Sequence, residues 1–486
     1  MPDCRPGERA LVGLRVLFEG AHLFSELEVA HPPVEAVLRR LLAALAARVG
    51  GLDDGTGEQW LDAREDLLVA GRFDRGRVHH YFDSYADAGR WNLYDLVRPF
   101  LQDPRLAGEC AEQAPPGRLA MDRPSGNNGV WTDHTPQETP LPGAEATGWL
   151  LAWHGFGPSG TAAVRQHADR SSKFCKAGPY RALISFFPHH PGSLFITLLV
   201  SVPAPGAWPS AAGEDLAPWE SPLLPDPLVP APASGPISLL TARTAHAMLL
   251  TGDDMGRTTG CWVTWGTPVD LPLAVDPYVV ERDEGGPLRA SRERSVWRDL
   301  DALLLKKRPG SKTAQRRPTA FDTLSELPPE VLERLGVRAV AWDQDKQDKN
   351  TQWYTATTPA VLAHIEEADP DGAAAIAACR SQAEAAAGDL GRALAAAWHA
   401  VNPRRPSKER EGFVGRARTQ FFEHAEREFW QTVDGSGDRP AFHRIALDCF
   451  DTAARSLKNT VQGMDAVAKA RASLTHPPRK NTRKTG

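Results

Sequence analysis

The chain has 486 residues, of which 42% are hydrophobic and 24% are charged. This balance is typical of globular proteins and excludes a chain that is disordered throughout. At roughly 150 residues per domain, the length allows two or three domains. Lys and Arg total 56 against 61 Asp and Glu, so the formal net charge is −5. That charge excludes a protein that coats nucleic acid through bulk positive charge, although a local basic surface is compatible with it.

The six cysteines are too far apart in the sequence to form a CxxC pair. This spacing argues against a zinc ribbon, a thioredoxin-like site and a disulfide scaffold. Residues 1–10 are polar and lack the apolar core of a signal peptide. The longest apolar runs, 41–47 and 195–200, are far shorter than the roughly 20 residues that span a bilayer. We therefore expect a cytoplasmic protein with no membrane partner, no bound metal and no cofactor.

The first strong element in chain order is a helix over 34–49, where apolar residues recur at helical spacing between a Pro-Pro pair and a Gly-Gly pair. After an aromatic-rich stretch and a proline-rich loop, a shorter helix is expected over about 144–154. We interpret 180–187 and 193–202 as two strands of a hairpin with His189 and His190 at its turn. Residues 203–236 hold ten of the 41 prolines, and we interpret them as a surface excursion.

The second half of the chain changes from strands to helices. Strand-like runs at 237–250 and 261–269 precede a helix at about 292–305, a basic loop at 306–318 and a strand at 337–342. Residues 359–471 are Ala-rich, with apolar stripes at helical spacing such as Phe421, Ala425 and Phe429. We predict an α+β protein: a mixed α/β domain over 1–357, an antiparallel four-helix bundle over 358–474 and a flexible basic tail over 475–486.

A glycine-rich loop follows the second predicted helix, and its first residues are Gly155, Phe156 and Gly157. Glycines allow the backbone to approach a phosphate or a base edge where a Cβ would clash. The loop has no Walker A ending, and it follows a helix, so it does not fit a GxGxxG dinucleotide motif. The alternative interpretation is a helix end followed by a tight turn.

Two further loops have the residue types that bind nucleic acid. One contains Asn127, Asn128, Gly129 and Trp131, where amides can hydrogen-bond base edges and an indole can stack. The other could contact phosphates through six basic residues, which are Lys306, Lys307, Arg308, Lys312, Arg316 and Arg317. The alternatives are a loop held by its own hydrogen bonds and a solvated basic loop.

No catalytic constellation is apparent in the sequence. There is no GxSxG elbow and no local Cys/His signature. The pairs His79-His80 and His189-His190 could suggest a metal, but adjacent residues on a strand point to opposite faces and no HExxH partner accompanies them. Exposed or packed histidines are the alternative.

A collinear set of segments that covers nearly the whole chain resembles the large subunit (CasA family) of the type I-E CRISPR surveillance complex, Cascade. The matching segments are Pro32-Pro33-Val34, 73–83, Asn92-Leu93-Tyr94-Asp95, 98–102, 122–128, 155–160, Trp297-Arg298-Asp299-Leu300 and 421–430. The resemblance implies a non-catalytic subunit bound to crRNA and to the backbone, small and handle-binding Cascade subunits. It also implies recognition of a protospacer-adjacent motif in double-stranded DNA, help in opening the duplex into an R-loop, and docking of a helicase-nuclease.

The resemblance further implies roles for individual loops. The loop 125–131 would meet the motif and the guide's handle, with Trp131 as its aromatic residue, and 155–157 would approach the minor groove. A wedge at a hairpin tip would fall on 344–347, where we select Gln344, Lys346 and Gln347. Cys261 stands alone where some members carry a cysteine cluster, so we predict no zinc. The competing hypotheses are an enzyme that acts on a small phosphorylated ligand and a scaffold that binds only proteins.

Overall fold

The computed structural model describes residues 9–54, 57–123, 135–206, 213–230, 233–242, 244–266, 276–284, 286–291, 294–306, 315–344, 350–436 and 441–475. The chain divides into two units. The first consists of Met1–Arg292 and Lys306–Ala363, and the second of Glu293–Leu305 and His364–Gly486. The short segment before Lys306 therefore belongs to the helical unit, although the sequence places it inside the first domain.

Within the described residues, the strands of the first unit form four small antiparallel sheets. Two of the three-stranded sheets contain the longer strands: β1 (Leu141–Pro142), which is short, pairs with β6 (Arg257–Trp265) and β6 with β5 (His246–Gly252) in one, and β11 (Asn350–Thr357), β10 (Gly336–Gln344) and β4 (Ile184–His189) form the other. The remaining sheets pair β2 (Gly160–His167) with β3 (Arg170–Cys175), and β7 (Glu281–Arg282) with β8 (Gly286–Pro287) and β9 (Gln315–Arg316).

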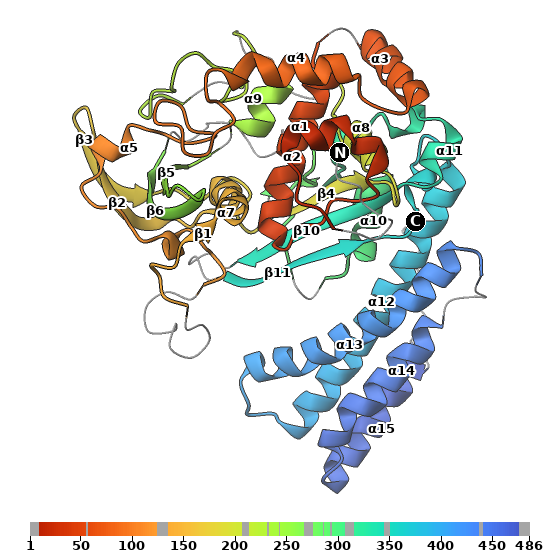
Figure 1. Ribbon diagram of the computed structural model, residues 1–486. Coiled ribbons are helices and arrows are strands. Elements are labelled where there is room, and N and C mark those ends of the chain that lie inside the picture. The colour runs from red at the N-terminus through yellow and green to blue at the C-terminus, as the bar shows by residue number, and fades with distance from the viewer. Residues whose placement is uncertain are drawn as a thin grey trace, which may run out of the picture. The chain divides into compact units, whose positions relative to one another are not determined.

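The predicted first helix is confirmed as α2 (Pro32–Gly50), which forms the centre of this unit. Prolines at its first two positions require no backbone hydrogen bond there, and Gly51 ends it with φ of 69°. Almost every side chain of α2 is buried, because the helix packs against α7, α9 and β10 (Figure 1). Arg40 is fully buried and paired with Asp276 at 2.9 Å, so a charge is compensated inside this core.

Further helices surround this centre. The second predicted helix is confirmed as α7 (Gly143–Phe156), which packs on α2 and β5. Among the described residues of the unit, the other α-helices are α1 (Leu14–Glu19), α3 (Gly57–Ala70), α4 (Arg75–Ala86), α5 (Leu106–Glu109), α8 (Leu194–Val200), α9 (Pro236–Thr241) and α11 (Pro329–Leu332). Short 3₁₀ turns lie at Ala21–Leu23, Pro116–Arg118, Thr319–Phe321, Leu324–Glu326 and Leu362–His364.

The prediction of a hairpin around His189 is wrong. Its first strand exists as β4, but β4 pairs with β10, and the second expected strand is the helix α8. Ser193 starts this helix by accepting a hydrogen bond from the Ile196 amide. Most of the side chains of α8 are buried, so the run lacks the polar positions that would have distinguished a helix from a strand.

Two neighbouring expectations also require correction. The strand-like run at 237–250 begins with α9, whose first amides donate to the Asp215 carboxylate, and only its end forms β5. The described part of the proline-rich segment is packed as well as exposed. Its Trp219 is 3% exposed, and Glu220 accepts two hydrogen bonds from Arg48. Proline-rich sequence excluded regular structure here, but it did not exclude burial.

The second unit is helical, as predicted. It comprises a 3₁₀ turn at Val296–Asp299, α10 (Leu300–Leu304), α12 (Pro370–Val401), α13 (Ser407–Val433), α14 (Phe442–Ala453), a turn at Ala454–Leu457 and α15 (Val461–Thr475). The long helix α12 packs against α13, α14 and α15. The predicted stripe on α13 faces this core, where the Phe429 ring stacks on Trp297 with centroids 4.7 Å apart. Among the described helices, none is both long and apolar enough to cross a membrane.

Candidate nucleic-acid interface

The glycine-rich loop leaves the end of α7 inside the first unit, and Gly155, Phe156 and Gly157 are buried. Their carbonyl groups accept hydrogen bonds from within the protein. Gly155 accepts from the Tyr180 amide at 2.9 Å, Gly157 from the Gly178 amide at 2.8 Å, and Phe156 from Arg181 Nη1 at 3.1 Å. These carbonyls are therefore already used in holding α7 against the segment that leads into β4.

The need for glycine at two of these positions is explained by packing. A Cβ on Gly155 would lie inside 3.0 Å of Val37 Cγ2, and one on Gly157 would lie 2.5 Å from His246 Cε1. The structure thus shows the helix end and tight turn that were the alternative interpretation of this motif. Contact of these three residues with DNA stays a prediction, and it would have to come through their exposed neighbours.

The exposed part of the loop is its last residue, Gly160, at the start of β2. It has φ of 127°, a conformation that favours glycine, and a Cβ there would meet nothing within 4 Å. Pro158, two residues earlier, is fixed through its carbonyl, which lies 3.0 Å from His246 Nε2. A partner approaching this loop would therefore contact residues 158–160, on a turn that the contact with His246 holds in place.

The buried His246 and the half-buried His154 support this region in their neutral form. Burial lowers the pKa of His246 and that of His154 to about 4. His154 lies 2.8 Å from Thr244 Oγ1 and 2.9 Å from the Leu101 carbonyl oxygen, so both of its ring nitrogens have partners. At neutral pH these side chains contribute hydrogen bonds rather than positive charge.

The predicted wedge is only partly within the described residues. Gln344, at the end of β10, is 6% exposed, and its Oε1 accepts a hydrogen bond from the Ala182 amide at 2.9 Å. Ala182 has φ of 62°, so this bond holds a residue in an unusual backbone conformation. Lys346 and Gln347 lie in 345–349, outside the described residues. In this structure Gln344 holds the Ala182 backbone instead of pointing outward.

The predicted phosphate-binding stretch also separates into different environments. Lys306 and Arg316 are exposed, whereas Arg317 is 2% exposed and donates to Asp322 Oδ1 at 2.7 Å. A phosphate could reach Arg317 only if that ion pair opened. Lys307, Arg308 and Lys312 lie outside the described residues, as do Asn127, Asn128, Gly129 and Trp131 of the other loop. Their roles stay predictions.

The histidine pairs do not form a metal centre with other described side chains. His79 pairs with Glu19 at 2.7 Å and His80 is exposed, while His189 and His190 are buried. Within the described ranges, no group of three His, Cys, Asp or Glu side chains could hold a metal ion. Cys261 is buried, and burial raises its thiol pKa to about 12.

Sequence analysis missed a basic ribbon formed by β2 and β3, directly after Gly160. One face packs on β6, where Arg165 and Arg170 lie over the Trp265 ring at 5.0 and 4.2 Å from its centroid. Arg165 is also held by Asp103 and Glu109, at 2.7 and 2.6 Å.

Arg170 is nevertheless exposed, as are Lys173 in β3 and Lys176 directly after it, and none of the three pairs with a carboxylate among the described residues. Phe174 beside them is 63% exposed. The signal in the sequence was four basic residues and one acid over 160–176.

Comparisons with known proteins agree with the resemblance in sequence. The family model described as CRISPR-associated protein Cse1 matches residues 3–463. A CRISPR-associated protein CasA/Cse1 from Thermus thermophilus is 31% identical over 363 residues, which span 71% of this chain and 66% of that relative, just under two thirds of its length.

Solved structures extend the comparison to the fold. A chain described as the CRISPR RNA-guided surveillance complex is 34% identical and superposes with a TM-score of 0.84 over 96% of both chains. Thermobifida fusca Cse1, at 19% identity and a TM-score of 0.74, covers 97% of this chain and 95% of its own and shows the same fold. The family model covers far more than half of the sequence, and the chain therefore belongs to the CRISPR-associated Cse1 family.

Proposed function

We propose that this chain is the non-catalytic large subunit of a crRNA-guided type I-E surveillance complex. Family membership over residues 3–463 supports this, as does the 34% identical chain from a CRISPR RNA-guided surveillance complex. Its partners are then the guide RNA and the backbone, small and handle-binding subunits, and its compartment is the cytoplasm. For the competing enzyme hypothesis, no group of three His, Cys, Asp or Glu side chains among the described residues could hold a metal ion.

We further propose that the first unit recognises a protospacer-adjacent motif in double-stranded DNA and helps open the duplex. In RNA-guided recognition, base pairing identifies the target, and the protein needs only to bind a short motif and the duplex backbone. The observation that carries this proposal is the set of exposed cations on the β2–β3 ribbon, directly after Gly160. Local positive charge of this kind is compatible with a chain whose formal net charge is −5.

Two more parts of this function rest on the family alone. The loops around Trp131 and Lys346 would contribute motif contacts, and the complex would recruit a helicase-nuclease to a surface of this subunit. Lys306 and Arg316 are exposed and could add phosphate contacts. A wedge that follows Gln344 in the chain would help to open the duplex.

The test uses the assembled complex and a duplex with a motif and matching target. Lys173→Gln together with Lys176→Gln removes two exposed charges without touching the buried face of the ribbon. Each phosphate contact contributes about −0.9 to the slope of log affinity against log salt, so in the double variant the slope should become less negative by about 1.8. The preference for motif-bearing over motif-free duplex should not change, because phosphates carry no base identity.

Arg72→Gln is the matched control, since Arg72 is exposed and lies elsewhere in the first unit. It should leave the salt slope unchanged. An unchanged slope in the double variant would refute the role of the ribbon. Failure of the wild-type chain to assemble with crRNA and the other subunits would instead refute the proposed function as a whole.

A further inference from the structure

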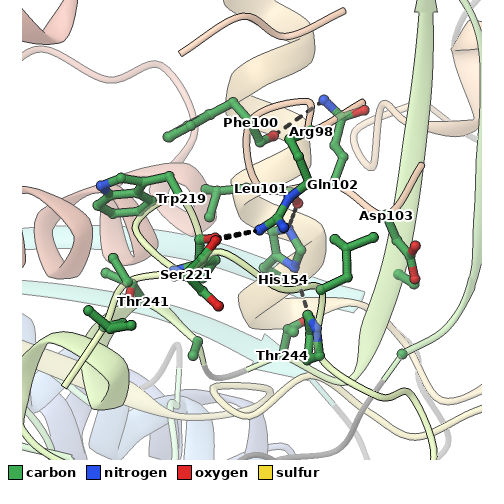
Figure 2. A pocket seen from close by; sticks show the side chains of 18 of the residues that line it. Arg98, Phe100, Leu101, Gln102, Asp103, His154, Trp219, Ser221, Thr241 and Thr244 are labelled. Carbon is green, nitrogen blue, oxygen red and sulfur yellow. Dashed lines mark hydrogen bonds between the residues drawn. The ribbon is translucent and has the colours of Figure 1, made fainter. Parts of the chain in front are cut away.

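A cavity of about 460 Å³ lies in the first unit, and neither family membership nor the proposed function accounts for it. It is bounded by the loop 98–105, the end of α7, the start of β5 and the proline-rich segment 213–225 (Figure 2). Sites for small molecules are typically concave, mostly apolar and roughly 300–1,000 Å³ in volume. The cavity therefore has the dimensions of a ligand site.

Most of the cavity wall is apolar and held in place. The apolar side chains include Phe100, Leu216, Trp219, Leu224, Ala242 and Met248. The rings of Phe100 and Trp219 lie 5.6 Å apart, and the Trp219 indole donates a hydrogen bond to the Tyr81 hydroxyl at 2.8 Å. An apolar body of a ligand would gain stability by leaving water for this surface.

Most of the neutral polar groups at the cavity are already satisfied by the protein; the exception is the buried Nδ1 of His246, which has no hydrogen-bond partner among the described residues. His154 has partners on both ring nitrogens, and the Gln102 amide donates to Leu93 and accepts from the Leu250 amide, each at 2.7 Å. Figure 2 shows His154 between Leu101 and Thr244. A neutral hydrogen-bonding ligand would thus find few free partners here.

The charged groups at the cavity differ from the neutral ones, because not every cation there is paired with an acid. Asp103 is shared by Arg105 and Arg165, at 2.8 and 2.7 Å. Arg98 donates only to backbone carbonyls, including those of Ser221 at 3.0 Å and Pro222 at 3.1 Å, as Figure 2 shows for Ser221. It has no carboxylate partner of its own among the described residues.

Arg90 is the second cation of the wall, and its Nη1 is buried with no hydrogen-bond acceptor among the described residues. The remaining acid of the lining, Glu214, is exposed. Arg90 and Arg98 are close enough for their like charges to lower the pKa of Arg98, after burial, which is the larger cause. An anion at this end of the cavity would reduce the repulsion between the two guanidinium groups.

We infer that the cavity binds a small amphipathic oxyanion, with a carboxylate or phosphate head at Arg90 and an apolar body against Phe100 and Trp219. Guanidinium groups bind both kinds of oxyanion through paired, charge-assisted hydrogen bonds. The inference is independent of DNA binding, because it requires neither the ribbon nor the glycine-rich loop.

Calorimetric titration of the purified full chain tests the inference, with octanoate, octyl phosphate, 1-octanol and inorganic phosphate as probes. The two amphipathic anions should bind more tightly than 1-octanol or inorganic phosphate, and the tighter of the two identifies the head group. Arg90→Gln should weaken binding of that anion by at least about tenfold, because it removes a charge-assisted hydrogen bond. Its affinity for 1-octanol should stay unchanged.

Two further variants separate the site from general effects. Ala242→Leu adds volume inside the cavity and should weaken binding of the anion and of 1-octanol alike. Arg72→Gln, which removes an exposed charge that does not line the cavity, should change neither. Equal affinities for octanoate and 1-octanol, no heat from the anions at about 10 mM, or an Arg90→Gln variant that binds as the wild type would each overturn the inference.

Discussion

The packing around Gly155 allows a prediction that specifies both the direction of the stability change and the residue that causes it. Gly155→Ala would place a Cβ inside 3.0 Å of Val37 Cγ2 and at 3.0 Å from Tyr180 Cδ2. Forcing an extra methyl into a filled core costs about 1–3 kcal/mol. The higher helix propensity of Ala at the end of α7 would return up to about 1 kcal/mol. We expect a net loss of about 1–2 kcal/mol in the free energy of unfolding.

The Val37 side chain is the origin of this clash, so a double-mutant cycle isolates it. Val37→Ala alone removes two methyl groups from the core and should cost about 1.6 kcal/mol, from ~0.8 kcal/mol per buried carbon. In the double variant the new methyl has room, so the combined loss should be smaller than the sum by about 1 kcal/mol or more. Urea unfolding of the isolated chain, monitored by tryptophan fluorescence, measures the free energy of unfolding of the wild type, the two single variants and the double variant.

Gly108→Ala is the control, because a Cβ there meets nothing within 4 Å. It should leave stability unchanged or raise it slightly. Additive losses at Val37 and Gly155, or a neutral Gly155→Ala, would refute the reasoning. The result also bears on DNA binding, since a bulky substitution at Gly155 that abolishes binding is uninterpretable unless the variant is shown to be folded.

Two more predictions concern buried charge. Because the folded pKa of His246 is about 4, below its ordinary value of 6.5, the fold favours the neutral ring and stability should be lost as pH falls below 6.5. This histidine should account for a loss of about 2 kcal/mol in the free energy of unfolding between pH 7.5 and pH 5. The His246→Gln variant, unfolded at both pH values, should lose less stability than the wild type. An equal loss in the variant would contradict the assignment. Asp276→Asn leaves Arg40, which is fully buried, without its ion partner, so the free energy of unfolding should fall by about 3–5 kcal/mol. A change below about 1 kcal/mol in urea unfolding would show that Tyr180 and Tyr278, whose rings lie 3.9 and 5.3 Å from the guanidinium, suffice to hold that charge.

Elements with a one-sided or strongly periodic pattern were predictable from the sequence. The helices α2 and α7 and the helices after Pro370 follow from local spacing, capping prolines and terminal glycines, and each signal lies within a few residues. The helix α8 was missed because burial on all sides removes the polar positions that reveal periodicity.

In the candidate site, too, local features could be predicted from the sequence and features that depend on distant residues could not. The sequence identified the glycine-rich loop as unusual, but not which of its residues are exposed. Val37 and His246, over a hundred and nearly ninety residues away in the chain, are what make Gly155 and Gly157 packing positions, and they leave Gly160 on the surface. The ribbon after it appeared only as a mild local excess of basic residues.

The sequence by itself determined the family resemblance, the two-part organisation and the helices whose signals are local. Only the tertiary structure decided which charges are available to a partner. Arg317 and Arg165 are consumed by carboxylates, at 2.7 Å from Asp322 and Asp103, while Lys173 and Lys176 stay exposed. The partner of Arg165 lies 62 residues away in the chain, and even the nearby Asp322 reaches Arg317 only through the folded backbone, so the availability of a cation depends on distances that no local pattern contains.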